Sequence, residues 1–181
     1  KRKGDSMRAK ILIGIFLIMV NLILMSSAGF TEEPKTILIH LKTSLKHDDA
    51  QICVAYNAIW AALEEGLRVD VLIDADAVNT YKKGLFGKDD IENYKLPENM
   101  RQALARQFNV PLEKVPAVYG EYLTMLKDKG AKFYINEEMI ITAGIAKGPG
   151  DMGRISAKFF KPVTMLELIR LRTGADSYLV Y

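Results

Sequence analysis

The stretch from Lys35 to Asp74 is the feature that most restricts the folds open to this chain. Thr36 to Leu41 is a continuous apolar run with β-branched residues, typical of a strand buried on both faces in a parallel sheet. A helix is predicted from Asp48 or Asp49 to Glu65, and Arg68 to Asp74 is predicted to be the next strand. This β-α-β pattern predicts an α/β fold with a mostly parallel sheet and helices on both faces.

A second informative stretch is Gly130 to Ile145, where a predicted strand leads directly into a predicted helix. Ala131 to Ile135 carries β-favouring aromatic and branched residues, and Asn136 stands at the N-cap position ahead of Glu137 and Glu138. In open α/β sheets, ligands bind in the crevice beyond the carboxyl ends of the strands. We therefore expect a functional site at this turn.

The remaining elements are predicted from apolar spacing and from the positions of Pro, Gly and capping residues. They are helices at Glu98 to Phe108, Ala117 to Lys129 and Met165 to Leu171, and strands at Ile155 to Phe160 and Ser177 to Tyr181. The intervening stretch from Asp74 to Glu98 is predicted to be a long polar excursion, either a functional loop or, as the alternative, a solvated insertion or an oligomer contact.

The first 30 residues have the form of an export signal. Lys1 to Ser6 is a polar extension before Met7, a basic segment follows, and Ile11 to Met25 is almost wholly apolar. Small residues at Ser26 to Ala28 have the spacing that a signal peptidase recognises. The pattern predicts a cleaved secretory leader, with a retained membrane anchor as the alternative. Residues 31–181 are then one domain, periplasmic or otherwise exported in either case, and membrane-anchored if the leader is uncleaved.

The charge balance and the cysteine content restrict the function classes further. The chain has 25 Lys and Arg against 22 Asp and Glu, but the first 30 residues hold five of the former and one of the latter, so the remainder, 20 against 21, is near neutral. This balance gives no electrostatic footprint for nucleic acid. With Cys53 as the single cysteine, neither an intrachain disulfide nor a cysteine-based metal cluster can form. We expect no cofactor and no metal site.

Several polar residues are candidates for the site at the strand ends. Asn136 with Glu137 can bind a small polar ligand, because an amide offers both a donor and an acceptor beside the free N–H groups of a helix start. The alternative is a simple N-cap without a ligand. His47 and Ser44 follow the first predicted strand and Asp74 ends the second, so all three are expected to line the same crevice.

Cys53 is the only sulfur nucleophile available to this chain. It lies in the first turns of its predicted helix and near His47 in sequence, a setting that favours a lowered thiol pKa. The alternative is a half-buried structural cysteine beside the apolar stripe of that helix. Both interpretations remain open from the sequence.

The run from Gly130 to Ile145, with Leu123 to Gly130 before it, resembles the DsrE family of small sulfur-relay proteins (DsrE/DsrF-like, TusD-like). The resemblance covers Lys35 to Tyr181. Members of the family place a reactive Cys directly after this strand, often with a second Cys three residues later. In this chain those positions fall on Asn136 and Met139, so the family's usual Cys is missing.

The resemblance implies a DsrE-like variant of the flavodoxin-like fold and assembly into homotrimers or hexamers. The expected function is an exported, non-catalytic or catalytically diverged binding or interaction module linked to sulfur-compound metabolism. Its expected partners are copies of itself and a small polar ligand or a sulfur-carrier protein. Nucleic acid is not expected as a partner, and a membrane only if the leader is retained. The alternative is a sulfur-transfer protein that relays a persulfide through Cys53.

Overall fold

The computed structural model describes residues 33–84 and 90–181. The chain divides into two units, Lys1–Glu33 and Pro34–Tyr181, and the architecture below is that of the second unit. The predicted polar extension and leader lie outside the described residues, so that assignment stays a prediction.

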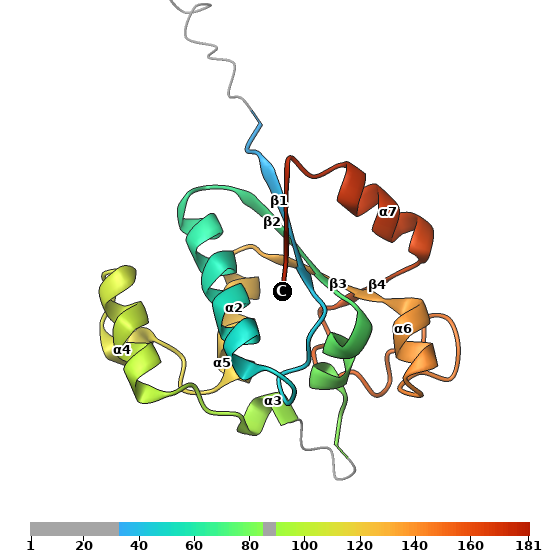
Figure 1. Ribbon diagram of the computed structural model, residues 1–181, viewed down its shortest axis with the longest axis horizontal. Coiled ribbons are helices and arrows are strands. Elements are labelled where there is room, and N and C mark those ends of the chain that lie inside the picture. The colour runs from blue at the N-terminus through green and yellow to red at the C-terminus, as the bar shows by residue number, and fades with distance from the viewer. Residues whose placement is uncertain (1–32, 85–89) are drawn as a thin grey trace, which may run out of the picture. The chain divides into compact units, whose positions relative to one another are not determined.

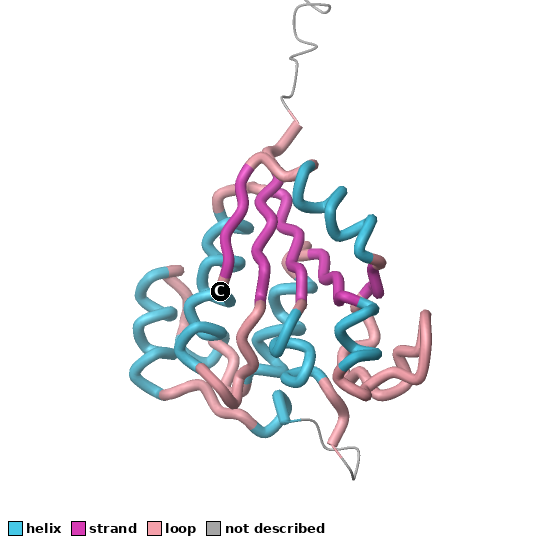
Figure 2. The backbone as a smooth tube through the Cα atoms, turned by 45° about the vertical axis from the view of Figure 1, so that its right-hand side comes forward, coloured by secondary structure: helices cyan, strands magenta, loops and turns pink. Residues whose placement is uncertain are grey.

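A single five-stranded sheet forms the centre of the second unit (Figures 1 and 2). Its strands are β1 (Thr36–Leu41), β2 (Arg68–Ile73), β3 (Lys132–Asn136), β4 (Lys161–Val163) and β5 (Ser177–Val180). They are arranged in the order β4-β3-β2-β1-β5, and every pairing between them is parallel. The predicted α/β class with its parallel sheet is therefore confirmed. All six residues of β1 are buried, as expected for an inner strand.

The sheet is covered by helices on both faces, and alternate strand residues supply two separate cores. The larger core packs beneath α2 (Asp49–Glu64), α4 (Glu98–Gln107) and α5 (Tyr119–Asp128), where the Trp60 ring stacks on Phe108 at 3.9 Å between centroids. The smaller core lies beneath α7 (Met165–Thr173) on the opposite face. It consists of Leu38, Leu72, Val163 and Leu168.

The short elements after β2 correct the predicted polar excursion. A 3₁₀ helix at Ala75–Tyr81 buries Ala77, Val78 and Tyr81 in the larger core, and α3 (Asp90–Asn93) follows. The beginning of this stretch is thus part of the packed interior. Its predicted polar centre falls largely on residues 85–89, outside the described part of the chain.

The predicted strand at Ile155 to Phe160 is wrong, because β4 begins only at Lys161. The backbone of the predicted segment bonds to the end of the 3₁₀ helix instead, with Ser156 N donating to the Tyr81 carbonyl at 2.9 Å. Ile155 and Phe160 are buried in the larger core, and the Phe160 ring lies 4.9 Å from that of Tyr81. Their apolar character therefore reflects packing of an irregular segment and not sheet pairing.

Candidate functional site

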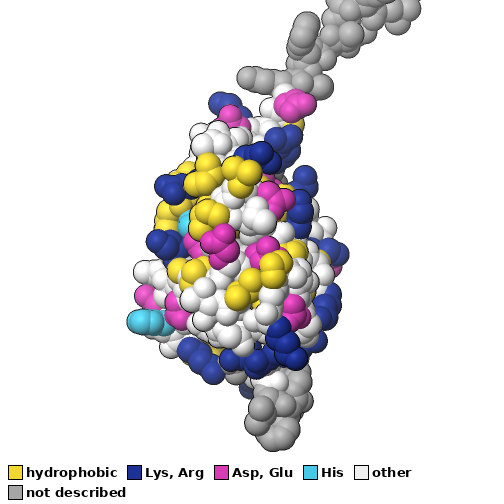
Figure 3. Space-filling view, turned by 90° about the vertical axis from the view of Figure 1, so that its right-hand side faces the viewer, with side chains coloured by type: hydrophobic (Ala, Val, Ile, Leu, Met, Phe, Trp, Pro, Cys, Tyr) yellow, Lys and Arg dark blue, Asp and Glu magenta, His cyan; other side chains and the backbone are white. Residues whose placement is uncertain are grey.

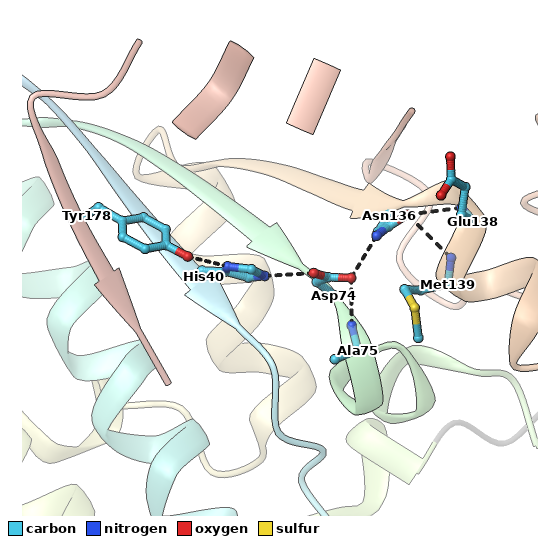
Figure 4. A network of polar contacts seen from close by, with 7 residues as sticks. All are labelled: His40, Asp74, Ala75, Asn136, Glu138, Met139 and Tyr178. Carbon is cyan, nitrogen blue, oxygen red and sulfur yellow. Dashed lines mark hydrogen bonds and ion pairs between the residues drawn. The ribbon is translucent and has the colours of Figure 1, made fainter. Parts of the chain in front are cut away.

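Four polar side chains form one hydrogen-bonded row across the carboxyl ends of the strands (Figure 4). The Tyr178 hydroxyl lies 2.7 Å from His40 Nδ1, and His40 Nε2 lies 3.1 Å from Asp74 Oδ2. Asn136 Nδ2 donates to Asp74 Oδ1 at 2.7 Å. The row therefore joins β5, β1, the residue after β2 and the last residue of β3. We call these four residues the strand-end network.

Strand register and alternation explain why these side chains meet. His40 and Tyr178 belong to neighbouring strands and point to the face that α7 covers, as do their core neighbours Leu38 and Leu72. Asp74 follows β2 directly, where the parallel strand ends come together. Residues far apart in sequence are thus brought to one edge of the sheet.

The turn after β2 fixes the direction of the Asp74 carboxylate. Asp74 has an extended backbone and accepts the Ala75 N–H at 2.7 Å through Oδ1. Ala75 has φ of 47°, in the left-handed region that costs a non-glycine residue about 1–2 kcal/mol. A local conformational cost therefore accompanies the fixed position of the carboxylate, a pattern that is frequent at functional sites.

Asn136 has no spare hydrogen-bonding capacity on its amide oxygen. It caps α6 (Glu137–Thr142), with Oδ1 accepting from Glu138 N at 3.0 Å and from Met139 N at 3.3 Å. Its amide nitrogen is engaged by Asp74, and the residue is 2% exposed. The predicted N-cap is therefore present, and a ligand at this residue would have to displace bonds that already exist.

The hydrogen bonds of the network stabilise the ionised form of Asp74. The bond from His40, with smaller contributions from the Ala75 N–H and the Asn136 amide, outweighs burial and lowers the pKa of Asp74 to about 2. Because a carboxylate only accepts, His40 Nε2 carries the proton in this contact, and in the neutral ring Nδ1 accepts from Tyr178. The network thus links a half-buried carboxylate to a half-buried phenol.

Ser44 and His47 come together in a second cluster, centred on Asp76. Ser44 Oγ donates to Asp76 Oδ2 at 2.5 Å, Asn79 Nδ2 donates to Oδ1 at 2.9 Å, and His47 Nδ1 lies 3.8 Å from Oδ2. The Ser44 bond lowers the pKa of Asp76, opposed by burial. The His47 side chain is 80% exposed. Asp76 lies two residues beyond Asp74, so the backbone links this cluster to the strand-end network.

The side chains of Glu137 and Met139 make their contacts outside the four residues of the strand-end network. The Glu137 carboxylate accepts the Gly150 N–H and so ties the glycine-rich loop after α6 to the start of that helix. Met139 is half-buried and packs against the larger core. Among the predicted site residues, the structure thus places Asn136 and Asp74 in direct contact and these two elsewhere.

Cys53 lies inside α2 and is 3% exposed. Burial raises the pKa of its thiol, against the hydrogen bonds with Tyr119 and Asn57. Thiols buried in this way are generally unreactive, because the thiolate is the nucleophile. The cysteine belongs to the larger core, on the opposite face of the sheet from His40 and Tyr178.

Two members of the network were missed as site residues by sequence reasoning. His40 falls inside the first predicted strand, Thr36 to Leu41, and Tyr178 falls inside the terminal predicted strand, Ser177 to Tyr181. Alternation along β1 is the signal that could have placed His40 on the same face as the network. Tyr178 depended on β5 pairing with β1, which no local pattern indicates.

The described residues hold no group of three or more His, Cys, Asp or Glu side chains suited to a metal ion. Within the same ranges, 33–84 and 90–181, no helix is both long and apolar enough to cross a membrane.

Comparison with known proteins gives information about the fold. Neither a family model nor a curated protein matches the chain. Among solved structures, the crystal structure of the ychN protein from E. coli matches with a TM-score of 0.50 and 17% identity, covering 82% of this chain and 99% of that one. The fold is DsrE-like. At this level of identity the match extends to the fold alone.

Within this DsrE-like fold, the strand end that the family resemblance associates with a thiol carries Asn136, the last residue of β3. Met139, three residues on, lies in the first turns of α6. Neither position offers a nucleophile, and Cys53 lies on another element.

We predict that the stabilising contribution of Asp74 depends on pH below about 4. Its folded pKa of about 2 lies below its ordinary value of 3.8, so the carboxylate stabilises the fold above pH 4, and this contribution is lost as the pH falls towards 2. The free energy of unfolding of the parent should exceed that of Asp74→Asn by a margin that shrinks by about 2 kcal/mol over this range. Urea titrations followed by circular dichroism measure it, and a margin independent of pH would contradict the prediction.

We also predict that Asn136→Ala destabilises the protein more than the loss of a helix cap alone. Removing a cap costs about 1 kcal/mol, and leaving the Asp74 carboxylate without its amide donor adds about 1–2 kcal/mol. Thr164→Ala removes the capping box of α7 without touching the network and is the matched control. If urea unfolding gives equal losses for the two variants, the bond between Asn136 and Asp74 contributes nothing to stability.

Proposed function

We propose that this protein is an exported DsrE-like binding or interaction module linked to sulfur-compound metabolism, and not a sulfur-transfer enzyme. The DsrE-like fold and the family resemblance of residues 130–145 support the link to sulfur compounds. The leader-like pattern of residues 1–30 supports export, with anchoring to the membrane if the leader is retained.

The observation that carries the proposal is the state of Asn136. The strand end where a relay thiol is expected from the resemblance holds an amide with three hydrogen bonds and 2% exposure. Such a residue is suited to holding the strand ends together, since it has neither a nucleophile nor open space beside it. We therefore infer that Asn136 has a structural role in place of a catalytic one.

The loop beyond β1 is the better surface for a polar ligand or for a sulfur-carrier protein. His47 is exposed, and Asp76 orients Ser44 beside it. The imidazole of His47 and the carboxylate of Asp76 offer a donor and acceptors at the surface, while the buried Ser44 hydroxyl holds that carboxylate in place. We therefore propose that a polar ligand or a sulfur-carrier protein binds at the Asp76 cluster, which lies two residues along the chain from Asp74.

The rival function is a persulfide relay through Cys53. A relay thiol must be accessible and ionisable, whereas this thiol is 3% exposed and its pKa is raised by burial. Its position in the larger core favours the structural role.

We propose that the protein assembles as a homotrimer or hexamer through the α7 face. Exposed apolar side chains on α7 support this, with Leu166 at 61% and Ile169 at 47% exposure. Figure 3 faces this side of the molecule, and hydrophobic side chains are visible among charged ones there.

We predict that Cys53 takes up no sulfur in the folded protein. After exposure to a low-molecular-weight persulfide donor, intact-mass spectrometry should find no added sulfur on the parent or on Cys53→Ser. Val54→Cys in the Cys53→Ser background is the positive control, because position 54 on the same helix is 50% exposed and its thiol should be modified. Added sulfur on the folded parent at the level of that control would establish Cys53 as a relay thiol and reject the proposal.

We predict that Leu166→Glu reduces the oligomer to smaller species, because a charge at the centre of an apolar contact remains unpaired after desolvation. Light scattering coupled to size-exclusion chromatography measures the mass. Val54→Glu on the other face of the sheet is the control and should keep the mass of the parent. A parent that is already monomeric would refute the assembly.

A further inference from the structure

A separate cavity lies between α7 and the sheet, at the opposite end of the strands from the network. Its volume is about 300 Å³, and its lining includes Thr36 and Arg68, the first residues of β1 and β2. The other wall comes from α7, including Arg170. The cavity shares no residue with the strand-end network or with the Asp76 cluster, so it is a distinct feature of the fold.

The floor of this cavity carries a carboxyl group where apolar residues are the norm. Asp70 lies in the middle of β2, on the face where its neighbours Leu38 and Leu72 form the smaller core. It is half-buried, and burial raises its pKa, against the nearby charges of Lys132 and Arg68 and a hydrogen bond with Tyr134. A carboxylate in this position loses more solvation than the charges of Lys132 and Arg68 and the hydroxyl of Tyr134 restore, because its pKa stays above the ordinary value.

The mouth of the cavity has the opposite charge. Lys161 at the start of β4 and Arg170 on α7 are both exposed there. The carboxylate of Glu167, which lies near both, is engaged in the capping box of α7, where it accepts from Thr164 N at 2.9 Å and from Thr164 Oγ1 at 3.0 Å. Two cations and the hydrogen-bonded carboxylate of Glu167 therefore line the entrance, which keeps a net positive charge, while Asp70 lies at the base.

The Arg68 guanidinium forms a fixed part of the cavity wall. Its Nε and Nη2 donate to Thr36 Oγ1 at 3.0 and 2.8 Å, which holds the group against the start of β1. The wall is therefore preorganised at this side, and it adds a cation near Asp70 to the lining of the cavity.

We propose that this cavity binds a small zwitterion of the amino-acid type, with its ammonium group on Asp70 and its acid group on Lys161 and Arg170. A charge-assisted bond from an ammonium donor would compensate the desolvation of Asp70, and the guanidinium of Arg170 can hold a carboxylate or a similar anion. A volume of about 300 Å³ is at the small end of the range for ligand pockets and suits a molecule of this size.

The separation of the charges distinguishes a zwitterion from simpler ions. A simple anion that fills the cavity would approach Asp70, and a simple cation would pass Lys161 and Arg170, so each half alone meets repulsion at one end. Only a molecule carrying both charges is matched at the floor and at the mouth. This inference does not depend on the proposed function, because it concerns other residues.

The test uses the full chain and a graded series of ω-amino acids from glycine to 6-aminohexanoate, because the two ends of the site prefer one spacing. Isothermal titration calorimetry should find at least one member of the series that binds. Its affinity should exceed that of the alkylamine and of the alkanoate of the same length by about tenfold, because each of these lacks one charge-assisted contact. If no member of the series binds, or if one half-molecule binds as tightly as the zwitterion, the proposal is wrong.

Variants locate the binding within the fold. Arg170→Gln at the exposed mouth and Asp70→Asn at the floor should each weaken the best member by about tenfold. Arg172→Gln is the matched control, because Arg172 lies two residues further along α7, outside the cavity lining, with its guanidinium 4.6 Å from the Tyr178 ring. The Arg172→Gln variant should bind the zwitterion with the same affinity as the parent. Equal affinity of the parent and Arg170→Gln, or equal weakening by Arg170→Gln and Arg172→Gln, would overturn the assignment.

Discussion

The carboxylate of Asp74 is the contact on which the arrangement of the strand ends depends. It accepts hydrogen bonds from His40, Asn136 and the Ala75 backbone, which belong to β1, β3 and the turn after β2. One ionised group thereby holds three neighbouring segments, and each donor stabilises its charge. Without it, a buried imidazole and a buried amide would both lose a partner in a poorly solvated environment. The left-handed backbone at Ala75 is the local cost of this arrangement.

This arrangement gives a structural role to the residue that ends β3 and caps α6 in this DsrE-like fold. A side chain that follows a strand and starts a helix is well placed for chemistry, because it lies near the helix N-terminus and the crevice. Here the same geometry serves to close the fold, since Asn136 caps α6 and donates to Asp74 at the same time. The polar groups that remain open to solvent lie on the neighbouring loop, around Asp76, and in the cavity beneath α7. In this chain, the polar groups available to a ligand therefore lie away from the strand end at Asn136.

Much of the fold could be predicted from the sequence because its signals are local. The apolar run of β1, the caps at Asp48 and Asn136 and the termination of α2 at Gly66 depend on neighbouring residues only. The segment from Ile155 to Phe160 misled because burial and β-favouring residues do not specify a hydrogen-bond partner, and its backbone pairs with Tyr81 and Lys82. The candidate site could be predicted only in part, because some of its residues meet through long-range strand pairing. Asn136 and Asp74 were expected at the strand ends, whereas Tyr178 joined them through the pairing of β5 with β1, which is set by the whole sheet.

The position of Cys53 has a consequence for how the molecule behaves among its own copies. A thiol that is 3% exposed within a packed helix cannot approach a second thiol closely enough for disulfide exchange, which requires direct contact between two sulfur atoms. An oxidising environment would therefore leave the folded chain free of covalent cross-links through this cysteine. Oxidants would reach this cysteine mainly in chains that have unfolded, so the oxidation state of Cys53 would record whether a given copy has lost its fold.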